Sequence, residues 1–329
     1  MKNIIVFGAT GDTGRYFMNY FKENYDGREY EIVAVGRRNK PLQWKEDIQY
    51  VKVDITNKND FLKLPNNVYA VVDLAGLMPA RMKGYDPYKY IDTNIVGSLN
   101  VLEYARKNNA DRILFTQSFG DIKDWSERQI LLTNNLTRCF DFKTDHTVYV
   151  MTKNFAVDLI ENYHQMYGLK NFIFRLPTIY LFSPNDKYYV DGIERKIGYR
   201  LIIDNAIAGN DIEVWGDPYR SKDMVYVKDL CQMLYKALWV KKDSGYYNVG
   251  TGVGTPLIEQ IETIIKVFSN PLKQSSLIMR PDKPNAPQYI MDIESAVKEL
   301  GYQPKYNFED AMKDFKLEME KYYLEGNNL

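Results

Sequence analysis

The stretch Ile4-Ile5-Val6-Phe7-Gly8-Ala9-Thr10-Gly11-Asp12-Thr13-Gly14 indicates the fold class of this 329-residue chain. Its four consecutive apolar residues predict a strand buried on both faces, as in a parallel sheet covered by helices. Three glycines at intervals of three follow, and they let the backbone turn tightly and approach an anion without a Cβ clash. A helix beginning after the last glycine would offer its unpaired N–H groups to that anion. We therefore expect a pyrophosphate site here, formed by Gly8, Thr10, Gly11, Asp12, Thr13 and Gly14.

Short apolar runs alternate with amphipathic segments along the first half of the chain. The predicted strands are residues 4–7, 32–35, 70–74, 113–115 and 172–176, and the predicted helices are 15–23, 94–107 and 150–167. In 94–107, apolar residues recur at spacings of three and four and form one stripe. This alternation, with right-handed crossovers, predicts an α/β, Rossmann-like, doubly wound parallel sheet.

The pattern loosens after residue 177, where prolines and glycines become frequent. Strand-like runs return at 224–227 and 246–249, and 308–324 predicts an amphipathic helix. We therefore divide the chain into a Rossmann-type nucleotide-binding domain, 1–176, and a smaller substrate-binding lobe, 177–329. Strands from about 222–250 are expected to return to the main sheet.

The composition excludes several classes of protein. Lys and Arg total 43 and Asp and Glu total 43, so no basic excess favours nucleic-acid binding. No apolar run reaches the roughly 20 residues of a membrane span, and the run after Met1 is too short for a secretory signal. The two cysteines and two histidines suggest neither a disulfide framework nor a metal site. We expect a cytoplasmic protein without membrane or nucleic-acid partners.

The end of the second predicted strand indicates the cofactor. An NAD site normally carries Asp or Glu there to bind the ribose 2′-hydroxyl, whereas this chain carries Arg37 and Arg38. A guanidinium group matches a phosphate and stays charged, so we predict NADP(H), with NAD as the alternative. Two solvated surface arginines are the other interpretation. Asp54 is placed to meet the adenine amine, and residues 73–76, including Leu74, Ala75 and Gly76, would line the cofactor.

A tyrosine and a lysine four residues apart, Tyr149 and Lys153, predict the catalytic groups. This spacing places both on one face of a helix, where the ammonium should lower the pKa of the phenol. Tyr149 could then exchange a proton with a sugar hydroxyl. Tyr85 and Lys89 repeat the spacing, but in a polar loop, so we favour the pair that opens the helix. Ser118, at the end of the strand 113–115, could hydrogen-bond the reacting oxygen.

The chain resembles the extended short-chain dehydrogenase/reductase family, in its nucleotide-sugar epimerase/dehydratase branch. The motifs that carry the resemblance extend over nearly the whole chain: Gly8-Ala9-Thr10-Gly11-x-x-Gly14, Asp54, Ala75-Gly76, Asn94-x-x-Gly97, Ser118, Tyr149-x-x-x-Lys153, Arg175-x-Pro177, the segment 222–229, the segment 248–252, Arg280, Asp292 and the segment 300–304.

The resemblance implies a Ser-Tyr-Lys catalytic set, a nicotinamide cofactor and a nucleotide-sugar substrate. It also implies that Lys153 binds the nicotinamide ribose, that Ile55, Asn94 and Pro177 join the cofactor site, and that helices 94–107 and 150–167 form a homodimer interface. The substrate residues implied are Ser118, Thr178, Arg220, Lys222 and Arg280, the last on the diphosphate. A surface arginine is the alternative interpretation of Arg280.

Two departures from the family pattern bear on the reaction. Family dehydratases carry adjacent Asp and Glu after the strand 113–115, where this chain has Phe119 and Gly120; a dehydration would lack its acid. Thr178 and Lys222 replace the Asn and Arg frequent in the family, with Arg220 as a possible substitute. We therefore expect a sugar-nucleotide epimerase. An NADPH-dependent keto-sugar reductase, or a non-catalytic NADP sensor, are the alternatives.

Overall fold

A seven-stranded parallel sheet forms the centre of the computed structural model, which describes residues 1–41, 44, 48–190, 192–270 and 272–324. Its strand order is β14-β7-β5-β4-β1-β2-β3, and every neighbouring pair is parallel. The strands are β1 Lys2–Phe7, β2 Tyr30–Gly36, β3 Gln49–Lys52, β4 Val68–Asp73, β5 Arg112–Ser118, β7 Lys170–Leu176 and β14 Ser244–Asn248. The Rossmann-like α/β class predicted from the sequence is therefore confirmed.

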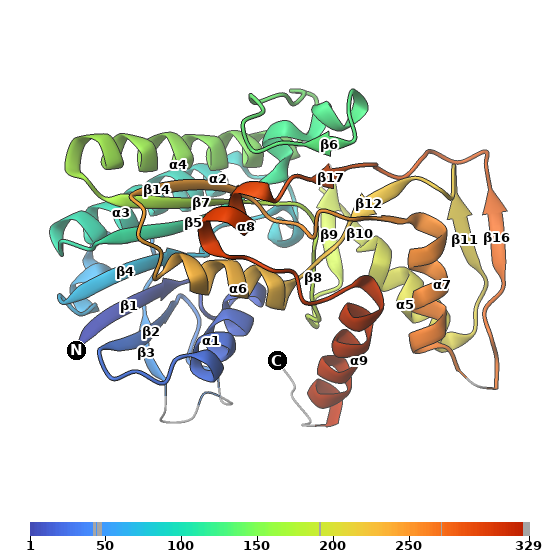
Figure 1. The fold of residues 1–329 in the computed structure, drawn as a ribbon, viewed down its shortest axis with the longest axis horizontal. Helices are drawn as coiled ribbons and strands as arrows, with labels where there is room; N and C mark the ends of the chain where they lie inside the picture. Colours follow the sequence, from blue (N-terminus) through green and yellow to red (C-terminus); the bar gives the residue numbers. More distant parts are fainter. Residues whose placement is uncertain (42–43, 45–47, 191, 271, 325–329) are drawn as a thin grey trace.

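Helices cover both faces of this sheet (Figure 1). Helices α3 (Gly97–Lys107) and α4 (His146–Tyr167) lie on one face, while α1 (Asp12–Asn24) and α6 (Val227–Ala237) lie on the other. The helix predicted at 94–107 begins irregularly, because α2 (Pro87–Tyr90) runs through a π-helical segment, η3 (Ile91–Val96), into α3. The described residues of this half also form three 3-10 segments: η1 Lys58–Lys63, η2 Pro79–Arg81 and η4 Phe119–Glu127.

In the described residues, the C-terminal lobe contains four further helices and small two-stranded sheets, one of which pairs β17 of the lobe with β6 of the first half of the chain. The strands pair as β10 with β9, β11 with β16, β12 with β15, β13 with β8 and β17 with β6. Their bounds are β6 Leu131–Leu132, β8 Ile179–Tyr180, β9 Lys187–Val190, β10 Ile193–Lys196, β11 Ile212–Trp215, β12 Ser221–Asp223, β13 Val225–Tyr226, β15 Gly254–Pro256, β16 Leu277–Arg280 and β17 Ile290–Met291. The helices are α5 Gly198–Ala208, α7 Leu257–Phe268, α8 Glu294–Leu300 and α9 Phe308–Leu324.

Of the strands in residues 222–250 that were expected to join the main sheet, one does so and another does not. β14 joins the edge of the main sheet against β7. β13 does not return; it pairs in parallel with β8, the strand that follows β7 after a short break. β13 has only two residues and leads directly into α6, and with β8 it forms a separate two-stranded sheet.

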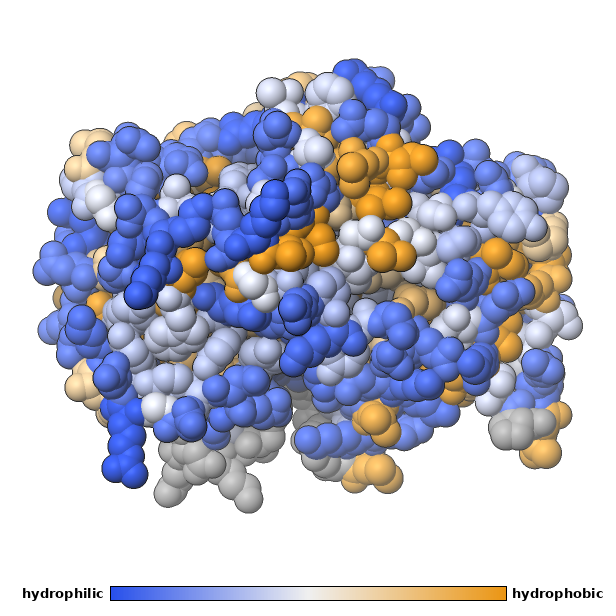
Figure 2. All heavy atoms as spheres, viewed as in Figure 1, coloured by the Kyte–Doolittle hydropathy of each residue, from blue (hydrophilic) through white to orange (hydrophobic). Residues whose placement is uncertain are grey.

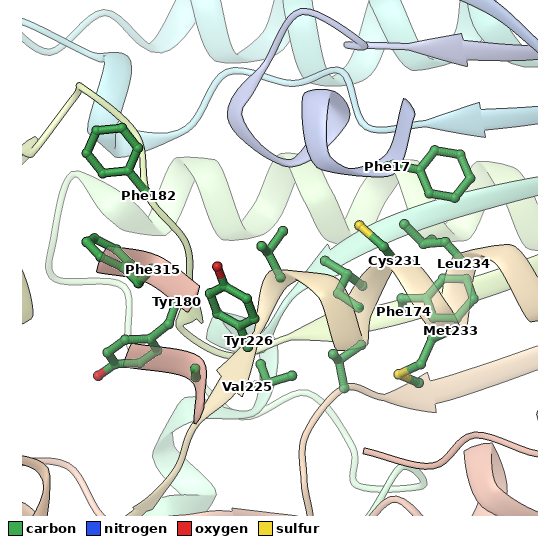
Figure 3. Close-up of a cluster of buried hydrophobic side chains, with 14 of the residues drawn as sticks. Phe17, Phe174, Tyr180, Phe182, Val225, Tyr226, Cys231, Met233, Leu234 and Phe315 are labelled. Carbon is green, nitrogen blue, oxygen red and sulfur yellow. The ribbon is translucent and has the colours of Figure 1, made fainter. Parts of the chain in front are cut away.

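One continuous apolar core joins the sheet to the lobe (Figure 3). Phe17 of α1 and Phe174 of β7 belong to the same buried cluster as Tyr180, Tyr226 and Phe315 of the C-terminal half. A second core, between the sheet and the helices α3 and α4, contains Phe7, Phe115 and Ile173 among others. The lobe is thus packed on the sheet rather than tethered to it.

Hydrophilic residues cover most of the face shown in Figure 2. Hydrophobic side chains gather in its upper middle and toward the edge of the lobe near α7. Within the described part of the chain, no helix combines the length and the apolar content needed to cross a membrane.

The glycine turn after β1 makes a close backbone contact with the turn after β4. Gly8 has φ +75°, and a Cβ there would lie 2.6 Å from the carbonyl carbon of Leu74. A Cβ on Gly14, in the first turn of α1, would lie 2.2 Å from the carbonyl oxygen of Gly8. These glycines are therefore required by close backbone packing, in addition to any ligand.

We predict that Gly14→Ala lowers the free energy of unfolding by about 2 kcal/mol, because backbone atoms must separate to accommodate the methyl group. Gly198→Ala is the matched control: it opens α5, and its added Cβ would meet no atom within 4 Å. The control should change stability by less than about 0.5 kcal/mol. Denaturant unfolding of both variants measures the difference, and equal stability of the two would contradict the packing argument.

Candidate active site

Two adjoining cavities form a cleft along the carboxyl ends of the central strands. The first, about 360 Å³, is bounded by the glycine turn and by the ends of β2 and β4. The second, about 310 Å³, extends from β4 to the ends of β5 and β7 and to the lobe. They share seven lining residues: Asp12, Thr13, Leu74, Ala75, Gly76, Leu77 and Met78. A ligand could therefore span both, at the edge where open parallel sheets bind ligands.

The first cavity contains the residues predicted for the cofactor. Its lining includes Gly8, Thr10, Gly11, Asp12, Thr13, Gly14, Arg37, Arg38, Asp54, Ile55, Leu74, Ala75 and Gly76. The helix α1 has no side-chain cap, and the backbone N–H groups of Asp12 and Thr13 have no acceptor among the described residues. Such a helix N-terminus suits a pyrophosphate. The cradle therefore fits a dinucleotide.

Arg37 and Arg38 are exposed side chains at the rim of this cavity, directly after β2. Asp54, after β3, turns its carboxylate onto its own loop, where Oδ1 accepts from the N–H and the hydroxyl of Thr56 at 3.0 and 2.8 Å. The other carboxylate oxygen of Asp54, Oδ2, accepts no hydrogen bond among the described residues. Only Oδ2 is therefore free to accept from an adenine amine.

The predicted catalytic residues line the second cavity together. Ser118 ends β5, and Tyr149 and Lys153 lie one turn apart on α4. Pro177, predicted for the cofactor, follows β7 and lines the same cavity. Tyr85, the rival tyrosine, is 44% exposed and lines neither cavity. The tertiary structure therefore separates two sequence motifs with the same spacing.

The pKa of Tyr149 is raised, whereas the sequence led us to expect that it is lowered. Burial raises the pKa of the phenol to about 12, and a hydrogen bond with Ser118 offsets this only in part. The prediction that Lys153 lowers it is wrong for this structure, because the ammonium lies elsewhere: Nζ sits 3.8 Å from the centroid of the Phe115 ring. Burial also lowers the pKa of Lys153, to about 8. Both groups are thus pushed toward their neutral forms.

Asn94 connects the loop after β4 to the catalytic helix. Its Oδ1 accepts from the N–H of Leu77 at 2.7 Å, and its Nδ2 donates to the carbonyl of Leu77 at 3.0 Å and to the hydroxyl of Thr152 at 3.1 Å. The Thr152 hydroxyl donates in turn to the carbonyl of Tyr149 at 2.8 Å. Asn94 was predicted to bind the cofactor; here it braces the loop and lies in the π-helical segment.

A second buried amide pair fixes α4 against β5. Gln117 donates from Nε2 to Oδ1 of Asn154 at 2.7 Å, while its Oε1 accepts from the N–H of Ser118. The hydroxyl of Ser118 accepts from the N–H of Gly120 at 3.1 Å. Both partners of this pair are buried. Gln117 therefore fixes the position of Ser118 relative to α4, the helix that carries Tyr149.

Asp12 bridges the glycine turn and the lobe where the two cavities meet. Its carboxylate accepts from Arg81 Nη2 at 2.8 Å and from the hydroxyl of Ser183 at 2.8 Å. The carbonyl of Ser183 accepts from Arg200 Nη1 at 2.6 Å. Asp12 was expected only as a residue of the anion loop. The sequence does not predict the bridge, because Arg81, the last residue of η2, and Ser183 are far from Asp12 along the chain.

The residues predicted for the substrate are not gathered at the cleft, apart from Ser118. Arg280, on β16, is held by Glu213 at 2.5 Å and Asp282 at 2.8 Å. Arg220 donates to the carbonyl of Ala286 at 2.7 Å. Lys222 lies 5.7 Å from the Tyr180 ring, and burial lowers its pKa. Thr178 is exposed and forms a hydrogen bond with Tyr289. None of these four lines either cavity of the described chain.

Several residues that line the second cavity were not singled out individually from the sequence, although the loops 77–90 and 185–199 were expected to determine the substrate. They come from the loop after β4 and from the lobe: Met78, Ala80, Ile179, Leu181, Ser183, Asn185, Ile197 and Tyr199. Most are apolar, with a few hydroxyl and amide groups. They carry no motif, and only their convergence in the fold identifies them.

Comparison with known proteins gives a consistent result. A family model described as the NAD dependent epimerase/dehydratase family matches residues 4–250. An uncharacterized protein of Methanocaldococcus jannaschii is 25% identical over 95% of both chains. The UDP-glucose 4-epimerase of Pisum sativum is 23% identical, over 95% of this chain and 94% of its own.

Among solved structures, the UDP-glucose 4-epimerase of Thermotoga maritima with UDP-glucose has a TM-score of 0.77 at 21% identity, covering 98% of this chain and 99% of that one. The UDP-glucose 4-epimerase of Thermus thermophilus in complex with NAD has a TM-score of 0.70 at 18% identity, covering 95% and 98%. These likenesses establish the fold.

We predict that Asn94→Ala lowers the free energy of unfolding by about 2 kcal/mol, since it leaves both backbone groups of Leu77 without their partner. The amide of Leu77 should exchange hydrogen faster. Asn108→Ala is the control, because the side chain of Asn108 makes one hydrogen bond, to the carbonyl of Tyr104 near the end of α3. Hydrogen-exchange mass spectrometry measures both, and unchanged protection at Leu77 in Asn94→Ala would contradict the bracing role.

Proposed function

The chain belongs to the NAD dependent epimerase/dehydratase family, and we propose that it epimerises a sugar carried on a nucleoside diphosphate, through a transient keto intermediate. The observation that supports this most is the position of Ser118, Tyr149 and Lys153 on one wall of a cavity that is continuous with the glycine-turn cavity. A reacting sugar carbon and a nicotinamide ring could meet there.

Tyr149 is the group proposed to exchange a proton with the sugar hydroxyl. Its raised pKa keeps the phenol protonated at neutral pH in this structure, so the base needs a further cation beside it. The bound cofactor would supply hydride acceptance and, when oxidised, a positive charge. Ser118, already bonded to Tyr149, orients the phenol and can donate to the reacting oxygen. Lys153 supplies an ammonium to the same wall and is proposed to bind the nicotinamide ribose.

We propose NADP(H) rather than NAD as the cofactor. Arg37 and Arg38 rim the cavity at the end of β2, where a 2′-phosphate would lie in a dinucleotide seated on the glycine turn. No carboxylate takes their place at that strand end. The same arginines favour the second candidate function, reduction of a keto sugar nucleotide, because a reductase consumes NADPH in each turnover.

A homodimer through α3 and α4 is proposed as the assembled form. These helices pack together over one face of the sheet (Figure 1) and leave apolar side chains exposed on their outer side. Met151 and Phe155, one turn apart on α4, are 48% and 46% exposed, and Leu99 on α3 is 36% exposed. A second copy of the chain could cover them.

We predict that Tyr149→Phe lowers kcat for a nucleotide sugar by about 10²–10⁴, because the proton-transfer group is lost while the ring is retained. Tyr85→Phe, which removes a hydroxyl outside the cleft, should leave kcat unchanged. Product analysis by chromatography measures turnover, and the absorbance of reduced nicotinamide separates the two candidates: epimerisation leaves it unchanged, whereas reduction lowers it. Full activity of Tyr149→Phe would refute both.

We predict that the double variant Arg37→Ala/Arg38→Ala binds NADP about 10- to 100-fold more weakly, since charged hydrogen bonds to a phosphate are lost. Binding of NAD should change by less than about threefold. Arg28→Ala/Arg195→Ala, which removes two exposed arginines that line neither cavity, controls for net charge. Calorimetric titration with each dinucleotide gives the ratio, and an equal loss for both would assign the arginines no part in cofactor choice.

A further inference from the structure

The ammonium of Lys153 lies in a nearly closed apolar setting. The residue is 6% exposed, and its Nζ rests over the ring of Phe115. No hydrogen bond of the described residues involves this Nζ. Burying an ammonium without an opposite charge costs free energy. Whether Lys153 stays protonated therefore depends on the charged groups near Phe115.

The strand register places a carboxylate beside Phe115. Asp73, the last residue of β4, is the direct parallel partner of Phe115 on β5 and of Phe7 on β1. Neighbouring strands lie about 4.8 Å apart, and directly paired residues point to the same face. Phe7 and Phe115 belong to the core under α3 and α4. Asp73 therefore points to the side from which α4 brings Lys153.

Asp73 is itself deeply buried and only partly satisfied by the backbone. It is 1% exposed, and its Oδ1 accepts from the N–H of Ala75 at 3.0 Å. That bond occupies one oxygen and leaves the negative charge without a full partner. A buried carboxylate is costly unless it is paired with an opposite charge.

We propose that Asp73 is the counter-ion of Lys153: a positioning residue that keeps the ammonium charged and seated over Phe115 at the wall of the cleft. Asp73 does not touch the reacting atoms in this arrangement. It acts through Lys153, which itself lines the cavity. The pairing rests on the structure alone, whereas its consequence for turnover rests on the proposed function.

The ionisation behaviour of the two groups is consistent with this pairing. Burial raises the pKa of Asp73 to about 6, and Lys153 opposes the rise. Burial lowers the pKa of Lys153 to about 8, and Asp73 opposes the fall. Tyr149, on the turn before, is neutral in this range, so Asp73 is the charged group that acts on this ammonium within the described chain. Both partners are charged between about pH 6 and pH 8.

The test is Asp73→Asn in the full chain. The asparagine oxygen can still accept from the N–H of Ala75, so the substitution removes the charge and keeps the loop. We expect the pKa of Lys153 to fall by about one unit or more, measured by NMR of lysine labelled with carbon-13 at Cε and assigned by the loss of its signal in Lys153→Met. Asp54→Asn, a carboxylate at the far end of the cleft, should leave that pKa unchanged. An unchanged pKa of Lys153 in Asp73→Asn would overturn the proposal.

The reciprocal variant keeps the test decisive if Asp73→Asn does not fold. In Lys153→Met, the carboxyl of Asp73 loses the cation that opposes desolvation, so its pKa should rise above about 6. NMR of carbon-13-labelled aspartate, with the Asp73 signal assigned in the wild type, follows this rise. A pKa that stays the same or falls would overturn the pairing.

The pH profile tests the consequence for turnover. Because Lys153 loses its proton as the pH rises through its pKa, the alkaline limb of kcat/KM should move to lower pH in Asp73→Asn, together with the pKa seen by NMR. A limb that does not move would overturn the positioning role. If the chain has no epimerase or reductase activity, the NMR titrations still decide the pairing, so failure of the proposed function is distinguishable from failure of this inference.

Discussion

The contact between the Gly8 turn and the backbone of Leu74 is the constraint on which the rest of the cleft depends. It brings the first turn of α1 against the loop that follows β4, at a separation that a Cβ would not permit. The lining residues that the two cavities share all come from these two segments of the chain. The loop after β4 is then held from its other side by Asn94, and through Thr152 it is linked to the helix that carries Tyr149. The backbone contact between Gly8 and Leu74 thus helps to position the glycine turn relative to the Tyr149 side chain.

Burial sets the electrostatics of the cleft. It moves Tyr149, Lys153 and Asp73 each toward the uncharged form, because desolvation is the largest cause of each pKa shift. Such a site holds its charges only where an opposite charge is supplied. The structure supplies one within the protein, for Lys153, and offers the uncapped N-terminus of α1 for an anion. The phenol lacks a comparable partner in the described chain, and its activation depends on what binds beside it.

The C-terminal lobe owes its position to the shared core rather than to a linker. Aromatic side chains of α1, β7, α9 and the β8–β13 pair form one buried cluster (Figure 3). The lobe can therefore contribute Ser183 to the glycine turn and Tyr199 to the second cavity with little freedom of movement. Its two-stranded sheets, by contrast, carry the exposed ion pairs of Arg280 well outside the cleft.

The sequence by itself determined the parallel sheet, the helices on both of its faces and the glycine turn, because consecutive apolar runs, glycine spacing and helical period are local properties of the chain. The sequence favoured Tyr149 over Tyr85, but the two motifs have the same spacing, and it is their positions in the fold that separate them. Helix α9 begins and ends where the periodicity predicts. Only the tertiary structure decided the rest: that β13 leaves the main sheet, that Arg280 is held by Glu213, that burial rather than Lys153 controls the pKa of Tyr149, and that Asp73 lies beside Phe115. Those outcomes depend on desolvation and on strand register, which join residues far apart along the chain and so leave no pattern at any fixed spacing.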